Sequence, residues 1–323
     1  MAARKRLKVK GKVVRAVRPN VGLEILYRKR LYKLVDDMCR SVQWWVTAGY
    51  RRVKPELAMD APADPPVVKV VNIGGARPWM AMIGGQPLRA DTGYELRFAT
   101  EENARRAARR FLGEMLPADE MQAIMADLTA QWQAAFDEGA EKLARSFSKD
   151  SSKFTDAQMH KTLADAGFTV RFAPTPAQMD VLRASVHENV SLIKSIPQQY
   201  LKNVEGMVMR SVQSGRDLST LYEDLQKQHG VTRRRAALIA RDQNNKATSV
   251  FQETRRKELG IKQAIWMHSH GGKTPRPTHV AMDGKIYDVN KGMWDSHEGK
   301  YVFPGQLINC RCVSRSVIPA LGS

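Results

Sequence analysis

Hydrophobic residues recur at three- and four-residue steps along most of the chain, a pattern that is typical of amphipathic helices. In residues 21–53 this spacing places Leu23, Tyr27, Leu31 and Met38 on one helical face. Similar periods return over residues 99–230 and predict a helical body there. Within this body, we expect one helix to end before Pro197 and another to end at Gly230.

Two segments depart from the helical pattern. Residues 54–98 hold six prolines and two Gly-Gly pairs, which predict an irregular arm with short strands. After Gly260 the period shortens, and "KQAIWMHSH", "GKIYDV" and "RCVSRSVI" each favour a strand. The expected fold class is therefore mainly α: an elongated helical body, an irregular Pro/Gly-rich N-terminal insertion, and a small α+β C-terminal module. The expected boundaries are 1–20 for an N-terminal arm, 21–53 for a helix, 54–98 for the insertion, 99–230 for the helical body and 231–319 for the module.

The C-terminal module concentrates residues that can bind a metal. It holds four of the seven histidines and two of the three cysteines. Thiolate and imidazole are the preferred ligands of zinc, so Cys310, Cys312 and His279 predict three ligands of a zinc site. The fourth ligand would be His268, or in its place His270 or His297. The alternative is structural: the C-x-C spacing is tighter than most zinc motifs, and the cysteines would pack as small apolar residues while the histidines form hydrogen bonds.

The chain is strongly basic, with 52 Lys and Arg against 33 Asp and Glu, a net charge of +19. This balance favours polyanionic partners, either nucleic acid or an acidic protein surface. No apolar run is long enough to span a bilayer and no secretory signal precedes the first helix, so we expect a soluble protein of a reducing compartment without a membrane partner. The N-terminal arm either binds a polyanion or only aids solubility, and its candidate binding residues are Arg4, Lys5, Arg6, Lys8, Lys10 and Lys12.

A nuclease is the enzymatic alternative. His279 could act as a base beside Asp283 and His297, while the basic surface holds nucleic acid. However, the sequence has no paired carboxylates at two-metal spacing, no phosphate-binding glycine loop and no Ser-His-Asp set. A further alternative is a DNA-binding module. The sequence favours a protein without catalytic activity.

A series of motifs in the C-terminal half carries a family resemblance. The segments "AALIARDQNNKATSVFQETRRKELGI", "RPTHVAMDG" and "PGQLINCRC" follow one another in order, with a tryptophan after the first. Together they resemble the phage Mu F-like minor head proteins, a family of phage head morphogenesis proteins, over about residues 187–319. The motif residues in this chain are Arg241, Trp266, Arg276, His279, Asp283, Gly284, Cys310, Arg311 and Cys312.

The resemblance implies a structural virion protein of a tailed bacteriophage. Such a minor capsid protein is present in few copies in the head, is assembled in the host cytoplasm, and acts in head assembly or DNA packaging. Its implied partners are the portal protein and the major capsid protein, and also scaffold and packaged DNA. The resemblance further implies a metal clip, although Ile308 stands where one histidine ligand would be expected. It also implies that Arg241 and Arg276 form ion pairs or contact a partner.

Overall fold

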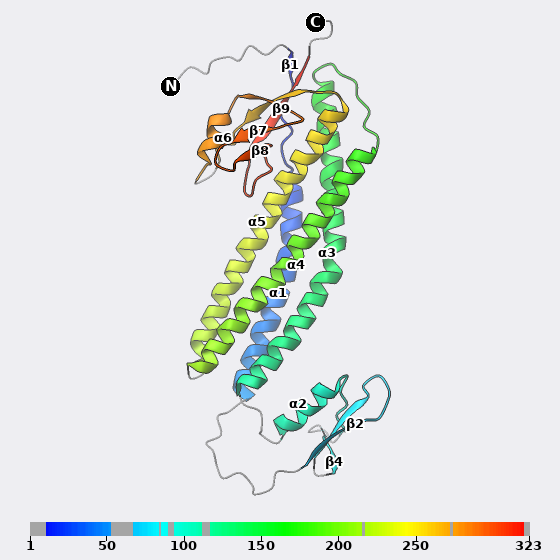
Figure 1. Cartoon of the computed structure of the whole chain (residues 1–323), viewed down its shortest axis with the longest axis vertical. Helices are drawn as coiled ribbons and strands as arrows, with labels where there is room; N and C mark the ends of the chain where they lie inside the picture. Colours follow the sequence, from blue (N-terminus) through cyan, green and yellow to red (C-terminus); the bar gives the residue numbers. More distant parts are fainter. Residues whose placement is uncertain are drawn as a thin grey trace. The chain divides into compact units, whose positions relative to one another are not determined.

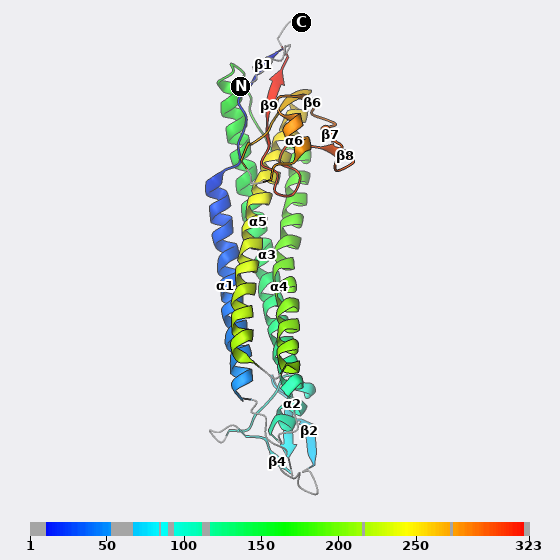
Figure 2. The same ribbon diagram turned by 90° about the vertical axis from the view of Figure 1, so that its left-hand side faces the viewer.

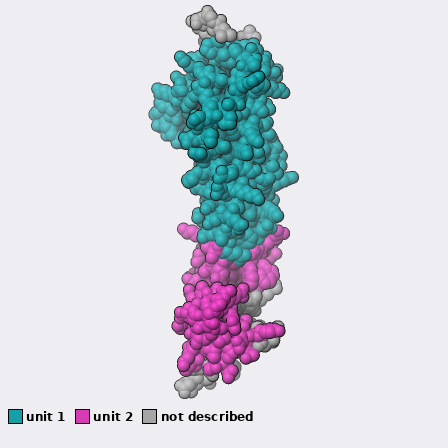
Figure 3. Space-filling view, turned by 90° about the vertical axis from the view of Figure 1, so that its right-hand side faces the viewer, with its two compact units in different colours: residues 1–39, 131–200, 227–323 teal, residues 40–130, 201–226 magenta. Residues whose placement is uncertain are grey.

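The computed structural model describes residues 11–52, 67–83, 85–89, 94–111, 117–214, 217–271 and 274–319. The chain divides into two compact units, which Figure 3 colours separately. Unit 1 comprises Met1–Cys39, Gln131–Tyr200 and Lys227–Ser323, and unit 2 comprises Arg40–Ala130 and Leu201–Gln226.

The described residues confirm the prediction of a mainly α protein with a small strand-rich C-terminal module. Within unit 1, parts of four long helices run side by side (Figures 1 and 2). The helices are α1 (Val21–Arg52), α2 (Glu101–Phe111), α3 (Pro117–Ala164), α4 (Pro176–Gln213), α5 (Leu218–Glu258) and α6 (Pro277–Met282). The strands are β1 (Lys12–Val13), β2 (Val68–Asn72), β3 (Trp79–Ile83), β4 (Gln86–Pro87), β5 (Gln263–Met267), β6 (Ile286–Asp288), β7 (Met293–Asp295), β8 (Lys300–Val302) and β9 (Val313–Ile318).

Two of the expected helix ends are wrong. Helix α4 continues through Pro197, and α5 continues through Gly230 without a break. In α4 the residues on either side of the proline, Ile193, Ile196 and Tyr200, are almost completely buried. Proline and glycine weaken a helix locally, but a buried apolar stripe on both sides stabilises its continuation.

In unit 2, the described part of the predicted irregular insertion is more regular than expected. Strands β2, β3 and β4 form an antiparallel sheet in which Val70 pairs with Ala81. Helix α2 contributes Ala104 and Ala108 to the core beneath this sheet, beside Ala81 and Leu88. Alanine at these positions lets the helix backbone approach the sheet closely, and larger side chains such as those of Trp79 and Phe98 pack around this contact.

The C-terminal module of unit 1 contains a four-stranded antiparallel sheet in the order β1-β9-β5-β6. Strands β5, β6 and β9 lie where the shortened period predicted them. Strands β7 and β8 add a separate hairpin, and the short helix α6 lies between β5 and β6 along the chain. The buried core of the module includes Trp266, Tyr287 and Val289, and both Cys310 and Cys312 belong to it.

The position of Lys12 corrects the predicted N-terminal arm. Lys12 lies in β1, where it pairs with Ile318 of β9, and its ammonium group donates a 2.6 Å hydrogen bond to the carbonyl of Ala166. The residue is therefore part of the fold rather than of a free basic arm. Its charged predecessors lie outside the described residues: Arg4, Lys5, Arg6, Lys8 and Lys10.

Two arginines near the end of α5 are buried, which is unusual for a charged side chain. Arg256 is 0% exposed and Arg255 is 3% exposed. Arg256 donates to Glu253 of the same helix and to the hydroxyl oxygens of Ser314 and Ser316 in β9. These contacts attach α5 to the sheet of the module. Some of the positive charge of the chain therefore lies inside the fold and stabilises it.

Candidate functional site

The polar face of α5 positions the loop that carries the two cysteines. Asp242 accepts a 2.7 Å hydrogen bond from the backbone N–H of Asn309, and Arg241 donates to the side-chain oxygen of Asn309 at 2.9 Å. One turn further along, Asn245 donates to the backbone carbonyl of Cys310. The bonds with Asp242 and Asn245 satisfy the backbone N–H of Asn309 and the backbone carbonyl of Cys310, and together with the Arg241 bond they fix the conformation of these two residues.

Three of the predicted metal ligands come together. The Nδ1 atom of His279, at the third position of α6, lies 3.4 Å from Sγ of Cys310 and 3.7 Å from Sγ of Cys312. The three ligand atoms all lie within 4.8 Å of one another, and all three residues are buried. The backbone N–H of Gly305 donates to Sγ of Cys310 at 3.3 Å, a contact that favours a thiolate at this position.

The second ring nitrogen of His279 faces a carboxylate that the sequence did not indicate. Nε2 of His279 lies 3.2 Å from Oδ2 of Asp295, whose side chain is fully buried. The pair is at ion-pair distance but does not meet hydrogen-bond geometry, so Nε2 is left without a hydrogen bond. Because the atoms are already this close, a small rotation of the imidazole would let its N–H donate to Asp295. Nδ1 would then keep its lone pair toward the two sulfur atoms.

The two cysteines have opposite pKa shifts. A hydrogen bond from Cys312 lowers the pKa of Cys310 to about 4, against the effect of burial, and His279 lowers it further. The same contact with Cys310, together with burial, raises the pKa of Cys312. The shifts have opposite signs because the two sulfur atoms hydrogen-bond to each other, so the thiolate form is favoured at Cys310 rather than at Cys312.

The carboxylate of Asp295 is held in its ionised form by the hairpin in which it lies. Burial raises the pKa of Asp295, but hydrogen bonds from the backbone N–H groups of His297 and Glu298 and from the hydroxyl of Thr278 outweigh it and leave the pKa lowered. Those backbone donors lie in the turn between β7 and β8. A negative charge is thus maintained next to His279 inside a buried site.

The other motif residues form the walls of this site. The indole of Trp266 meets the His279 ring edge to face, with 5.0 Å between ring centroids. Arg276 donates to the carbonyl of Ile308 at 3.0 Å, and Arg311 donates to the carbonyl of Gly271 at 3.2 Å. Like Arg241, these arginines bond to neutral oxygen atoms of loops. The expectation was that Arg241 and Arg276 form ion pairs or contact a partner. In the structure both donate to oxygen atoms of the loop that carries the cysteines, and contact with a partner stays a prediction.

His268, the preferred fourth ligand in the sequence, does not join the three ligand atoms. Its backbone N–H donates to Asp283, and its Nδ1 atom accepts from the backbone N–H of His270. Asp283 also lies 3.2 Å from His270, and Gly284 follows it in a turn with φ = +76°. His268 nevertheless borders a cavity of about 360 Å³ that Cys310, Cys312, His279, Arg276 and Arg311 also line.

The candidate residues for a nuclease do not form one cluster. His279 contacts the cysteines and Asp295, whereas Asp283 contacts His268 and His270. His297 is exposed and lies 3.7 Å from Glu298. In the part of the chain that the structure describes, His279, Cys310 and Cys312 are the sole group of His, Cys, Asp and Glu side chains with metal-binding spacing.

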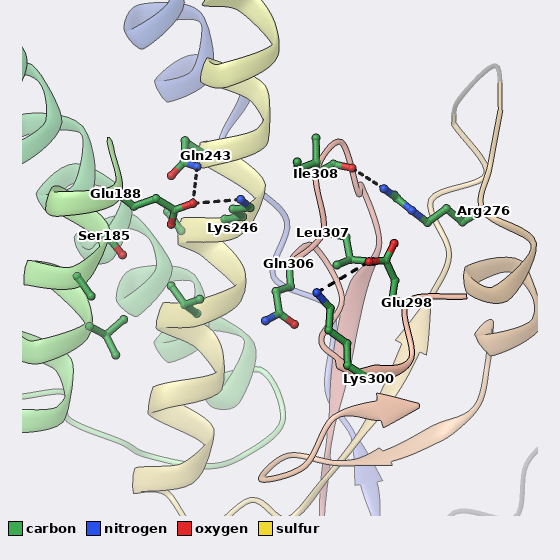
Figure 4. A pocket seen from close by; sticks show the side chains of 14 residues that line it. Ser185, Glu188, Gln243, Lys246, Arg276, Glu298, Lys300, Gln306, Leu307 and Ile308 are labelled. Carbon is green, nitrogen blue, oxygen red and sulfur yellow. Dashed lines mark hydrogen bonds and ion pairs between the residues drawn. The ribbon is translucent and has the colours of Figure 1, made fainter. Parts of the chain in front are cut away.

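A larger groove of about 600 Å³ lies between α4, α5 and the loop at 306–308 (Figure 4). On its helical side, Glu188 accepts hydrogen bonds from Gln243 and Lys246. On the opposite side, Arg276 reaches the carbonyl of Ile308, and Lys300 lies 3.9 Å from Glu298. Its charges of both signs are largely paired with each other, so the groove does not select a ligand of one charge.

Sequence reasoning missed Asp242, Asn245 and Asp295, each of which positions a site residue. The segment "DQNNKATS" of α5 did offer a signal, because it has amides and hydroxyls where an exposed helix face usually carries Lys and Glu. Small polar residues of this kind are suited to bonding with a backbone packed against the helix. Asp295 gave no comparable signal, since its partner His279 is distant in sequence.

Comparison with protein families finds a match in the part of the chain that carries the motifs. Residues 202–315 match the family model described as "Phage Mu protein F like protein". The match extends from the later part of α4 through α5 to β9, and it therefore includes His279, Cys310, Cys312 and Asp295. This match confirms the resemblance to the Mu F-like phage head morphogenesis proteins that was drawn from the motifs.

A protein of Haemophilus influenzae (strain ATCC 51907 / DSM 11121 / KW20 / Rd), described as "Uncharacterized protein", is 34% identical to this chain over 147 residues. The aligned part is 45% of this chain and 31% of the relative, so the chain spans about a third of the relative's length. No solved structure matches the chain.

Proposed function

We propose that this protein is a minor head protein of a tailed bacteriophage that acts in head assembly or DNA packaging near the portal. The observation that carries the proposal is the match of residues 202–315 to the Mu F-like family. Its proposed partners are the portal protein and the major capsid protein, with scaffold and packaged DNA as further polyanionic partners. The proposed location is the head of the virion.

The charge of the chain supports this role. A net charge of +19 attracts DNA phosphates and acidic protein surfaces alike. Arg255 and Arg256 are engaged inside the fold, so the attraction rests on exposed basic side chains and on the N-terminal basic residues. Among the described helices, none combines the length and apolar composition needed to cross a bilayer.

The test is association with phage heads. An epitope-tagged copy of the protein is expressed in a producing host, and heads are purified on a density gradient after nuclease treatment. We expect the protein to sediment with heads at far fewer copies than the major capsid protein, and to bind purified portal protein. Its absence from heads, together with failure to bind portal and capsid proteins, would rule out the proposal.

The same protein preparation separates this role from cleavage of nucleic acid. Since His279, Asp283 and His297 each contact different partners, we expect plasmid DNA to be retarded in a gel but not cut in the presence of magnesium, manganese or zinc. Cleavage that disappears in a His279→Ala variant would favour the nuclease instead.

A further inference from the structure

We propose that Cys310, Cys312 and His279 bind a zinc ion, that Asp295 orients His279 for this purpose, and that the fourth coordination position opens into the adjoining cavity, where an exchangeable water or small anion occupies it. The inference concerns a metal centre and does not depend on association with phage heads.

The spacing of the ligand atoms fits a tetrahedral ion. Zinc–sulfur bonds of about 2.3 Å and zinc–nitrogen bonds of about 2.0 Å, at a tetrahedral angle, separate a sulfur and a nitrogen ligand by about 3.6 Å. The observed Sγ to Nδ1 distances are 3.4 Å for Cys310 and 3.7 Å for Cys312. An ion can therefore be placed between the three atoms with little movement of the loops that carry them.

The surroundings of His279 also fit a metal-bound imidazole, because a buried carboxylate lies beside its second ring nitrogen. A metal-bound histidine commonly donates its other ring N–H to a carboxylate, which fixes the orientation of the ring and strengthens it as a ligand. Asp295 is 0% exposed and lies 3.2 Å from Nε2 of His279, on the side of the ring opposite the sulfur atoms. Nε2 is a buried polar atom without a hydrogen bond in the present geometry, so rotation of the ring on metal binding would also satisfy it.

The fourth coordination position faces a cavity that borders the three ligands. The three ligands line a cavity of about 360 Å³ together with Arg276 and Arg311, and His268 is engaged with His270 and Asp283. Three protein ligands and one open position are typical of zinc sites that exchange a ligand with solvent. The two guanidinium groups favour an anion over a neutral ligand at the open position.

The first experiment measures metal content. The full chain is purified from zinc-supplemented cells and analysed by elemental mass spectrometry. We expect about one zinc per chain, as a single tetrahedral site requires. Cys310→Ser and His279→Ala should lose the metal, whereas Cys39→Ser, which alters the buried cysteine of α1, should retain it.

The second experiment uses cobalt in place of zinc in the wild-type chain, so it does not depend on whether a variant folds. Thiolate-to-cobalt charge-transfer bands and the visible bands of a four-coordinate ion are expected. Azide should shift the visible bands, because it can replace the exchangeable fourth ligand. A His268→Ala variant should behave like the wild type in both respects.

The third experiment tests Asp295 by competition with a chromophoric chelator. Asp295→Asn should weaken zinc binding by about 10- to 100-fold and alter the cobalt spectrum. Asp288→Asn, at the exposed end of β6, serves as the matched control and should change neither.

Each part of the proposal has its own contrary result. A wild-type chain without bound zinc and without thiolate–cobalt bands overturns the metal site. Visible bands that do not respond to azide, or that change in His268→Ala, overturn the open fourth position. Unchanged zinc affinity in Asp295→Asn overturns the orienting role of Asp295.

Discussion

At the level of single residues, the side chain of Arg256 lies completely buried between α5 and the C-terminal sheet. It donates to Glu253 at 2.6 Å, and Glu253 also accepts a hydrogen bond from the hydroxyl of Tyr287 at 2.8 Å. A buried charge is tolerated only when it is paired and hydrogen-bonded. Arg256 also donates hydrogen bonds to Tyr287 of β6 and to Ser314 and Ser316 of β9, so it links α5 to the sheet of the module.

Replacement of Arg256 by methionine should destabilise the protein by about 3–5 kcal/mol, because Glu253 is then left buried without its cation. The measurement is urea unfolding followed by circular dichroism. The matched control is Arg234→Met, an exposed arginine on the same helix, for which a change within about 0.5 kcal/mol is expected. Equal effects of the two substitutions would contradict the structural role of Arg256.

Asn309 adopts a left-handed backbone conformation with φ = +60° directly before Cys310. Both Asn309→Gly and Asn309→Ala remove the hydrogen bond from Arg241, but only alanine is strained at this φ. We therefore expect the alanine variant to be less stable than the glycine variant by about 1 kcal/mol in urea unfolding. Equal stability would mean that residue 309 does not need a positive φ.

At the level of elements, the continuity of α5 is the main departure from expectation. Gly230 was predicted to end one helix, because glycine often supplies the left-handed residue after a C-terminus. In the structure it lies inside α5, and an added Cβ would meet its nearest neighbour, Nη1 of Arg234, at 3.5 Å. Gln228 and Thr232, on either side of it, are buried. Packing on both sides therefore outweighs the low helix propensity of glycine.

Gly230→Ala should stabilise the protein by about 0.5–1 kcal/mol, since alanine favours the helix and finds room there. Gly260 provides the opposite case: it follows α5 with φ = +67° and nothing lies within 4 Å of an added Cβ. Gly260→Ala should therefore lower stability through backbone strain alone. Thermal unfolding of both variants tests the pair, and destabilisation by Gly230→Ala would restore the two-helix interpretation.

At the level of the whole molecule, the net charge of +19 is divided between structural and available groups. Arg255 and Arg256 are buried and Lys12 lies in β1, whereas α3 carries exposed basic residues. The remaining N-terminal cations precede β1 in the sequence. Their contribution to polyanion binding can be measured separately from that of the folded surface.

Changing the five N-terminal cations before β1 to glutamine should weaken binding to duplex DNA and reduce its dependence on salt. If each one contacts a phosphate, the magnitude of the slope of log K against log salt should fall by up to about 4.5 units. The variant carries Arg4, Lys5, Arg6, Lys8 and Lys10 changed to glutamine.

The matched control removes the same number of charges from the exposed face of α3 and should leave the slope nearly unchanged. An equal fall in both variants would show that the N-terminal residues act only through net charge. The control carries Lys142, Arg145, Lys149, Lys153 and Lys161 changed to glutamine.

The sequence by itself determined the features that depend on local pattern. Helical periodicity predicted a mainly α protein, the shorter period predicted β5, β6 and β9, and the motif order predicted the Mu F-like family. Residue chemistry also singled out His279, Cys310 and Cys312, whose potential ligand atoms the structure brings within 4.8 Å of one another. These inferences need only spacing along the chain and the properties of the side chains.

Only the tertiary structure decided the features that depend on distant partners. It continued α4 through Pro197 and α5 through Gly230, because buried contacts outweigh local propensity. It separated His268 from the ligand atoms and brought Asp295 to His279 through the β7–β8 hairpin. It also buried Arg256, which links α5 to the C-terminal sheet. Local sequence cannot specify these outcomes, because each depends on which distant residues meet when the chain packs.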